Sequence, residues 1–271
     1  MTEPSADDPD RTRAVDDEER DRSVRFSALV QGATFARRYT IVERLGSGGS
    51  GEVFHAHDTI ADVAVALKVL YPGPPDSSRG LERMRRELRI LRGLDHPGIV
   101  RVHDVGVADG LLYVVMELLE GRSLRERLAE GPPPSPDETG RILSGLLTAI
   151  ETAHARGVVH RDIKPANVFL VRTADAEDRV VLLDFGLARA PDDPRLTATG
   201  ALLGTPAYMS PEQALGQAPG PASDLYGAGL VLWELLHGAP PFDADSAISV
   251  MKAHATGALP RPRDAARAVP G

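Results

Sequence analysis

The chain has 271 residues, of which 42% are hydrophobic, so it is long enough for one large domain or for two lobes that share a cleft. It contains no cysteine, which excludes disulfides and cysteine-ligated metals, and its longest apolar runs, such as residues 227–233, are too short to cross a membrane. The net charge of −8 argues against nucleic-acid binding, which needs a basic surface, and we expect a cytoplasmic chain without a membrane segment.

Residues 1–36 mix charges of both signs with few aromatic side chains, and they are predicted to form a disordered acidic leader ahead of a domain at 37–271. Folding is expected to begin near Tyr39. Three short runs rich in apolar and β-branched residues, separated by Gly or Asp, predict an antiparallel meander. These runs are residues 39–45, 52–57 and 61–70.

A helix is predicted at residues 81–92, where apolar side chains recur at intervals of three and four and Gly93 follows. Glu87 lies on this apolar stripe. A buried carboxylate is costly unless a cation meets it, so we expect Glu87 to pair with a cation such as Lys68. The alternative is a glutamate at the rim of the stripe that reaches water.

Further strands are predicted at residues 99–107 and 111–118, and mainly helical sequence follows them. Ser123 and Ser135 each begin a Ser-x-x-Glu pattern, which predicts a capping box at the start of a helix. The helix after Ser135 is expected to end at Gly157. Two more helices are predicted at residues 223–236 and 247–255.

A glycine-rich motif at residues 46–53 reads Gly-Ser-Gly-Gly-Ser-Gly-Glu-Val and fits G-x-G-x-x-G-x-V. A dinucleotide-binding loop would open a helix, whereas residues 52–56 predict a strand, and no Gly-Lys-Ser/Thr follows for a P-loop. A glycine flap between two strands lets backbone N–H groups approach phosphates. The alternative is an ordinary glycine-rich hairpin.

Lysine and asparagine are rare in this chain: there are three lysines against 28 arginines, and Asn167 is the only asparagine. Lys164 and Asn167 both lie in His-Arg-Asp-Ile-Lys-Pro-Ala-Asn at residues 160–167, and Lys68 ends Val-Ala-Leu-Lys. A compact ammonium that meets phosphate oxygens and a neutral amide oxygen that binds a metal are roles that arginine and aspartate cannot fill. This distribution therefore indicates phosphoryl transfer.

Taken together, these motifs resemble those of the protein kinase family over residues from about 39 to 271. The matching set continues with Asp-Phe-Gly at residues 184–186 and with Ser-Pro-Glu at 210–212, in the place of Ala-Pro-Glu. The resemblance implies an α+β, bilobal fold. A small antiparallel sheet with one helix would form the N-lobe, about 37–116, and a mainly helical C-lobe would span about 120–271.

The resemblance also implies catalytic roles. Asp162 would accept or orient the proton of the attacking hydroxyl, and Lys164 would neutralise charge on the γ-phosphoryl group of ATP. Lys68 would hold the α- and β-phosphates while it pairs with Glu87, so that the lysine is positioned only when the helix is docked.

Metal and nucleotide contacts follow from the same resemblance. Asn167 and Asp184 would provide oxygen ligands to Mg²⁺, with Mn²⁺ as an alternative metal. Adenine would lie in an apolar stack, Met116 would limit the back pocket, and two backbone groups of the following residues would bind the base edge. The nucleotide set implied in this way is Gly46, Ser47, Gly48, Gly49, Gly51, Val53, Ala66, Lys68, Met116, Glu117, Leu119 and Phe169.

Lys164 and the Gly-Thr-Pro-Ala-Tyr-Met stretch at residues 204–209 resemble the serine/threonine type. Within that group, Lys-Pro-Ala-Asn at 164–167 and Tyr-Met-Ser-Pro-Glu-Gln at 208–213 are most similar to bacterial Hanks-type enzymes. The implied partners are proteins with Ser or Thr acceptors. Thr197 and Thr199 lie in the segment after Asp-Phe-Gly, where a phosphate would meet Arg161 through charge-assisted bonds. We expect autophosphorylation there, in trans within a dimer; the alternative is that both are ordinary loop threonines.

Two rival functions are a small-molecule phosphotransferase with a kinase-like fold and a catalytically silent nucleotide-binding scaffold. The first would lack the peptide-docking segment at residues 204–212. The second would not need Lys68, Asp162, Asn167 and Asp184 together.

One departure from the family concerns Glu212. The family usually continues past the position of Gly271 through two more helices, which supply an arginine that pairs with the position of Glu212. We therefore expect a truncated C-lobe in which Glu212 lacks that partner.

Overall fold

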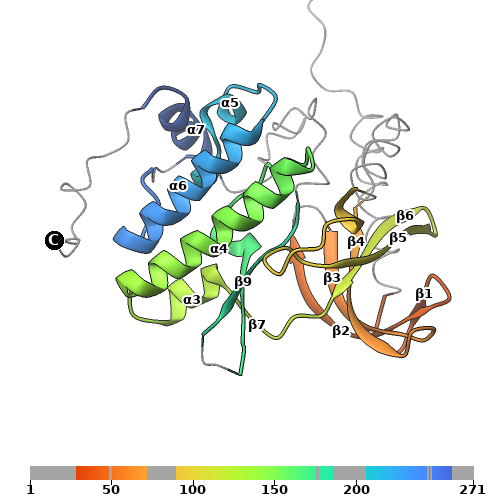
Figure 1. Cartoon of the computed structure of the whole chain (residues 1–271). Coiled ribbons are helices and arrows are strands. Elements are labelled where there is room, and N and C mark those ends of the chain that lie inside the picture. Colours follow the sequence, from red (N-terminus) through yellow and green to blue (C-terminus); the bar gives the residue numbers. More distant parts are fainter. Residues whose placement is uncertain are drawn as a thin grey trace, which may run out of the picture. The chain divides into compact units, whose positions relative to one another are not determined.

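The structure is a computed structural model, and it describes residues 29–48, 51–71, 90–174, 177–185, 206–242, 244 and 246–257. The chain divides into two compact units. The first comprises Met1–Gly73 with Gly106–Leu118, and the second comprises Pro74–Val105 with Leu119–Gly271. The first unit is built on a β-sheet and the second mainly on helices, as the α+β prediction requires (Figure 1).

The sheet of the first unit has six strands in the order β1-β2-β3-β4-β6-β5. The strands β2, β3 and β4 pair antiparallel in sequence order, which is the predicted meander, but β4 then pairs with β6 and leaves β5 at the edge. The part of β5 before Gly106 belongs to the second unit. The strands are β1 Thr34–Phe35, β2 Tyr39–Gly48, β3 Gly51–Asp58, β4 Val63–Leu70, β5 Val102–Ala108 and β6 Leu111–Glu117.

Strand pairing gives this sheet two faces of different composition. Phe54 lies opposite Leu67, which lies opposite Val115, and all three are at most 1% exposed. Side chains alternate along a strand, so Lys68, which is next to Leu67 on β4, points to the other face, as do the residues two positions away from Lys68. Burying each large apolar side chain stabilises the fold by about 1.5–3 kcal/mol. The buried cluster comprises Phe35, Tyr39, Ile41, Phe54, Ala56, Val65, Leu67, Val69, Leu111 and Val115.

The second unit combines a helical layer with a small antiparallel sheet in the order β7-β8-β9. Figure 1 shows α4 and α6 lying side by side, and β9 packs against α4. Among the described residues, no helix is long and apolar enough to span a membrane. The helices are α3 Leu124–Glu130, α4 Pro136–Ala155, α5 Pro211–Ala214, α6 Pro221–His237 and α7 Ala247–Thr256, and the strands are β7 Gly121–Ser123, β8 Val168–Val171 and β9 Arg179–Leu182.

The helix starts follow the predicted caps with one difference. Ser123 forms a complete capping box with Glu126 at the start of α3. Ser135 accepts the backbone N–H of Glu138, but the carboxylate of Glu138 binds Nε and a terminal nitrogen of Arg127 at 2.9 and 2.8 Å. The prediction of a second capping box is therefore half right, because a bidentate guanidinium is a stronger partner for a carboxylate than a backbone N–H is.

Two predictions concern the start of the folded domain and the helix at residues 81–92. Strand β1 lies within residues 1–36, the range predicted as a leader, and Phe35 in it is only 4% exposed. The prediction that folding begins near Tyr39 is therefore wrong by several residues, because Phe35 pairs with Tyr39 and joins the core. Of the helix predicted at 81–92, only residues 90–92 are described, and they are helical.

Candidate active site

A buried aspartate of α6 holds the loop that leads to Asp162. Asp224, which is 1% exposed, accepts the backbone N–H groups of His160 at 2.8 Å and of Arg161 at 2.7 Å. Its carboxylate also bonds to Nε2 of His154, on α4, at 2.7 Å. Arg161 has a φ of 67°, a left-handed conformation that is costly for a residue with a side chain. Asp224 thus secures strained backbone directly before Asp162.

The carboxylate of Asp162 has two side-chain partners from the turn that follows it. Nζ of Lys164 lies 2.9 Å from its Oδ2, and Nδ2 of Asn167 lies 3.2 Å from the same oxygen. Nδ2 of Asn167 also donates to the carbonyl oxygen of Asp162 at 2.8 Å. The side chains of Asp162 and Lys164 remain 22% and 20% exposed, so the carboxylate is oriented but still reachable from solvent.

His160 connects this loop to the segment that carries Asp184. Its ring is buried, and burial holds the pKa of His160 below its ordinary value, so the imidazole is neutral. Its Nε2–H donates to the carbonyl oxygen of Leu183 at 2.7 Å, and its Nδ1 accepts the backbone N–H of Asp162 at 3.2 Å. The ring also contacts Phe185, with the centroids 4.7 Å apart.

Asn167 directly precedes β8 and Asp184 lies two residues after β9, so both lie at the open end of the β8–β9 hairpin. The backbone N–H of Leu183 donates to the carbonyl oxygen of Asn167 at 2.8 Å, and Asp184 follows Leu183 with a φ of 50°. Because Nδ2 of Asn167 is bonded to Asp162, the planar amide directs its Oδ1 away from that carboxylate.

The chemistry of these donors fits a hard divalent cation. One amide oxygen and one carboxylate are a small set, and no group of three or more His, Cys, Asp or Glu that could hold a metal occurs among the described residues. Mg²⁺ is ordinarily bound in this way, by one or two protein oxygens together with phosphates and water. Asn167 and Asp184 therefore fit a metal that arrives with a nucleotide better than a resident metal cage.

Strand register places four predicted nucleotide residues on one face of the first unit's sheet. Val53 lies directly opposite Lys68, and Ala66 lies directly opposite Met116. Lys68 and Ala66 are two apart on β4, so all four side chains share the face opposite the hydrophobic cluster. An ammonium flanked by apolar side chains suits a ligand with a phosphate chain and an apolar ring.

The glycine motif forms a hairpin between β2 and β3, in which Gly46 pairs with Val53 and Gly48 with Gly51. Gly51 has a φ of 152°, and a Cβ there would lie 2.2 Å from the carbonyl oxygen of Val69, so the fold itself requires glycine. A Cβ at Gly46 or Gly48 would meet no atom within 4 Å. The open space at these two positions leaves room for a ligand.

The other predicted site residues are spread over both units or lie outside the described residues. Ser47 pairs with Glu52 in the glycine hairpin. Glu117 ends β6, Leu119 follows it in the second unit, and Phe169 lies on β8. Outside the described residues are Gly49, Glu87, Thr197 and Thr199.

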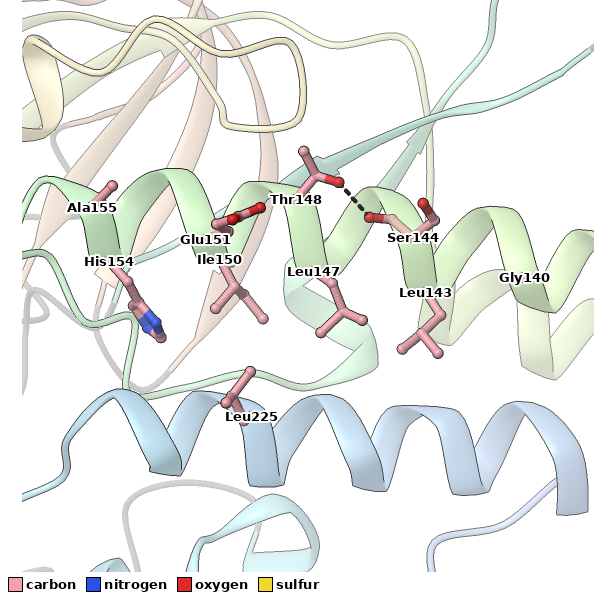
Figure 2. A pocket seen from close by; sticks show the side chains of 10 residues that line it. All are labelled: Gly140, Leu143, Ser144, Leu147, Thr148, Ile150, Glu151, His154, Ala155 and Leu225. Carbon is pink, nitrogen blue, oxygen red and sulfur yellow. Dashed lines mark hydrogen bonds between the residues drawn. The ribbon is translucent and has the colours of Figure 1, made fainter.

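A surface groove of the second unit involves none of the predicted site residues. Figure 2 shows Leu143, Leu147 and Ile150 of α4 directed towards α6, where Leu225 completes the lining. Leu147 and Leu225 are 39% and 54% exposed. The lining is mainly apolar, although it also includes Ser144, Thr148, Glu151 and His154, and it contains neither Lys164 nor the aspartates of the candidate site.

The structure adds residues that the sequence analysis does not single out. Asp224 falls in the first turn of a predicted helix, where an acidic residue ordinarily faces solvent. A weak signal is Gly227, one turn later: a Cβ there would lie 2.9 Å from Cβ of Ile163, so α6 packs closely against the loop after Asp162. No local pattern indicates bonds between residues more than 60 positions apart, as for His160 and Asp224.

Glu212 has a partner of a different kind from the arginine of the family. The hydroxyl of Ser223, on α6, donates to its Oε1. Burial raises the pKa of Glu212, but the hydrogen bonds from Ser223 and from neighbouring groups outweigh it, and the net pKa lies below the ordinary value. Glu212 is therefore an ionised residue that ties α5 to α6.

Comparison with known proteins agrees with this geometry. The family model described as "Protein kinase domain" matches residues 39–264. The chain is 38% identical to the serine/threonine-protein kinase PrkC of Bacillus subtilis (strain 168) over 226 residues, covering 83% of this chain and 34% of that protein. It is 43% identical to the probable serine/threonine-protein kinase SCO3848 of Streptomyces coelicolor (strain ATCC BAA-471 / A3(2) / M145) over 223 residues, covering 80% of this chain and 32% of that protein.

Solved structures give the same result. A crystal structure of the PknI kinase domain of Mycobacterium tuberculosis is similar with a TM-score of 0.64 and 32% identity, over 80% of this chain and 78% of that chain. The chain belongs to the protein kinase family. Its curated relatives are serine/threonine kinases of the bacterial Hanks type, and the chain spans about a third of their length.

Proposed function

We propose that this chain is an ATP-dependent protein kinase that transfers the γ-phosphoryl group to Ser and Thr hydroxyls of proteins. The observation that carries the proposal is the arrangement around Asp162, whose carboxylate is bonded to Lys164 at 2.9 Å and to Asn167 at 3.2 Å on a backbone secured by Asp224. The names of the relatives support the Ser/Thr specificity.

Asp162 would orient the acceptor hydroxyl and take its proton as the O–P bond forms. Lys164, already bonded to that carboxylate, would place its ammonium near the transferring phosphoryl group and neutralise the negative charge that develops there. Because the neutral ring of His160 accepts the N–H of Asp162, the loop stays in place without adding a second charge beside the base.

The nucleotide contacts that the family relationship implies concern the phosphates and the base. Gly46, Ser47, Gly48 and Gly51 would approach the phosphates, and Lys68 would contact the α- and β-phosphates. Phe169 and the backbone of Leu119 would contact the base. Val53, Ala66, Met116 and Glu117 would complete the adenine contacts.

Asn167 and Asp184 would hold the divalent metal, which we propose to be Mg²⁺. When bound at these two residues, such a metal would supply positive charge that offsets the charge of the phosphates. The protein's own part is to present two hard oxygens from the ends of one hairpin, which the bond between Leu183 and Asn167 keeps in register.

The regulatory and cellular parts of the proposal rest on the family relationship. We propose autophosphorylation at Thr197 or Thr199, in trans within a dimer, and a cytoplasmic location for the kinase domain. Mass spectrometry of active enzyme should detect phosphate on one of these threonines. Full activity with both threonines unmodified would contradict this part.

The decisive experiment compares wild-type protein with Asp162→Asn. Labelled ATP, Mg²⁺ and a generic basic protein are supplied, and the phosphoamino acid is identified. We expect phosphoserine or phosphothreonine from the wild type and a rate about 10²–10⁴-fold lower from Asp162→Asn. Asp178→Asn is the matched control, because Asp178 is exposed in the same unit.

The outcomes also separate the rival functions. Nucleotide binding without transfer by the wild type would indicate a silent scaffold. Transfer to small molecules but not to protein would indicate a small-molecule phosphotransferase. Equal transfer by the wild type and Asp162→Asn would remove Asp162 from its proposed role.

A further inference from the structure

The peptide that joins Arg161 to Asp162 is held at both of its polar atoms. Its carbonyl oxygen accepts a hydrogen bond from Nε2 of Gln213 at 2.8 Å. Its N–H donates to Nδ1 of His160 at 3.2 Å. Arg161 itself has the left-handed φ of 67° described above, which persists only where the surrounding bonds hold it. Gln213 supplies one of those bonds, from outside the loop.

Gln213 is suited to this role because its amide is buried and is hydrogen-bonded at both its oxygen and its nitrogen. The residue is 4% exposed, and its Oε1 accepts the backbone N–H of Ser210 at 3.0 Å, which completes the capping box of α5. A backbone N–H can only donate and a carbonyl can only accept, so these two partners allow one orientation of the amide. Rotating it would lose both hydrogen bonds and place like groups against each other.

Arg161 is therefore clamped between two helices of the second unit. Its N–H is held by Asp224 of α6 at 2.7 Å and its carbonyl oxygen by Gln213 of α5 at 2.8 Å. The two helices are linked to each other, because the hydroxyl of Ser223 on α6 donates to Glu212 on α5. The backbone before Asp162 thus depends on α5 being correctly placed on α6.

We propose that Gln213 is a positioning residue for Asp162 and that it makes the orientation of this carboxylate depend on the placement of α5. The inference rests on the proposed function of Asp162. Without the bond from Gln213, the part-buried carbonyl group of Arg161 loses a hydrogen bond, and the strained backbone loses one of the contacts that hold it. Asp162 then departs from the reactive geometry, while the nucleotide-binding residues of the first unit are untouched.

The sharpest test is Gln213→Glu, which changes one atom of the side chain. A glutamate at this position can still accept the N–H of Ser210, so the capping box of α5 is retained. Its other oxygen, however, faces the carbonyl oxygen of Arg161 and cannot donate when ionised. Gln213→Met, which is similar in size and uncharged, removes both hydrogen bonds of the amide without adding a charge.

For both variants we expect kcat to fall by about 10- to 100-fold, because a small misplacement of a reacting group costs rates of this order. The KM for ATP should stay within about twofold of the wild-type value, since uniform binding is unaffected. Gln217→Glu and Gln217→Met are the matched controls, because Gln217 follows α5 and is exposed. Assays are run well below the measured Tm of each variant, so that all of them are folded.

Hydrogen exchange provides a readout that does not depend on activity. Backbone amides of residues 160–163 should exchange faster in Gln213→Glu than in the wild type and in Gln217→Glu. Wild-type kcat in the Gln213 variants, or unchanged exchange, would overturn the inference while the proposed kinase function stands. If residues 160–163 exchange faster in Gln213→Glu but the wild-type protein transfers no phosphate, the proposed function is contradicted while the role of Gln213 in holding the loop stands.

Discussion

Single buried polar side chains fix the backbone around Asp162. Asp224 accepts two backbone N–H groups and bonds to one imidazole, and both ends of the Gln213 amide are bonded. Removing such a partner leaves a buried group unsatisfied, which costs about 1–3 kcal/mol. The backbone that precedes the proposed base is therefore held by buried residues, whereas the carboxylate itself is oriented by Lys164 and Asn167.

Two glycines of the same motif should respond differently to alanine. Gly51→Ala places a Cβ 2.2 Å from the carbonyl oxygen of Val69 at a φ of 152°, so we expect a loss of stability of more than about 2 kcal/mol. Gly46→Ala meets no atom within 4 Å and should keep the wild-type Tm, while its affinity for ATP falls. Thermal unfolding with and without ATP measures both effects. Equal Tm values for the two variants would contradict this assignment.

The ion pair between Arg38 and Asp58 should make stability depend on pH. Its two hydrogen bonds measure 2.8 and 2.7 Å, and the hydrogen bond from Arg38 is the largest cause that lowers the pKa of Asp58 from 3.8 to about 2. A lowered folded-state pKa means that the stabilisation is complete above the unfolded value of 3.8 and is lost as the pH falls through about 2. Asp58→Asn should therefore cost about 2 kcal/mol at neutral pH.

The measurement is denaturant unfolding of the wild type and Asp58→Asn across a pH series. The difference between their free energies of unfolding should be constant at neutral pH and shrink below about pH 4. Asp62→Asn is a suitable control, because the side chain of Asp62 is 91% exposed. A difference that does not change with pH would show that the carboxylate of Asp58 is not the titrating group.

At the scale of elements, helix caps and one ion pair set how α3 and α4 meet. Ser123 and Ser135 supply the N-caps, as predicted from the sequence. Arg127, with its side chain 9% exposed, bonds to both oxygens of Glu138 and to the carbonyl oxygen of Pro132. This guanidinium therefore joins α3, the linker and the first turn of α4.

Arg127→Ala should lower the free energy of unfolding by about 2–4 kcal/mol, because it leaves a half-buried carboxylate and a carbonyl without their donor. Arg122→Ala is the matched control. Its nearest carboxylate, that of Glu130, is 3.9 Å away, and both side chains are well exposed, so the change should stay within about 0.5 kcal/mol. Urea unfolding of the two variants measures this difference. Similar losses of free energy of unfolding would mean that the buried, bidentate pair of Arg127 and Glu138 contributes no more stability than an exposed pair.

For the whole molecule, the division into two compact units predicts separate unfolding transitions. Each unit has its own hydrophobic core, and the single tryptophan, Trp233, lies on α6 of the second unit with its ring stacked on His237. Asp58→Asn should shift the part of the circular dichroism signal that belongs to the first unit and leave the midpoint of Trp233 fluorescence unchanged. Arg127→Ala should shift that fluorescence midpoint. Coincident shifts of both signals in either variant would indicate one cooperative unit.

Local patterns determined much of the fold. Runs rich in apolar and β-branched residues predicted β2, β3, β4 and β6, and Ser and Gly at the proper positions predicted where α3 begins and where α4 begins and ends. These predictions succeed because hydrophobic period, capping and turn chemistry act over a few residues. The short strands β7, β8 and β9 were not predicted, because they have three or four residues each and their pairing is decided by distant partners.

Sequence alone indicated the chemistry that we propose for this protein. The single asparagine, the rare lysines and the motifs around them indicated phosphoryl transfer, because those side chains cannot be replaced by their common substitutes. Only the tertiary structure decided how the loop before Asp162 is held. Asp224 and Gln213 lie more than 50 positions from the backbone groups of His160 and Arg161 that they bind, and a hydrogen bond depends on distance in space, which no local pattern encodes.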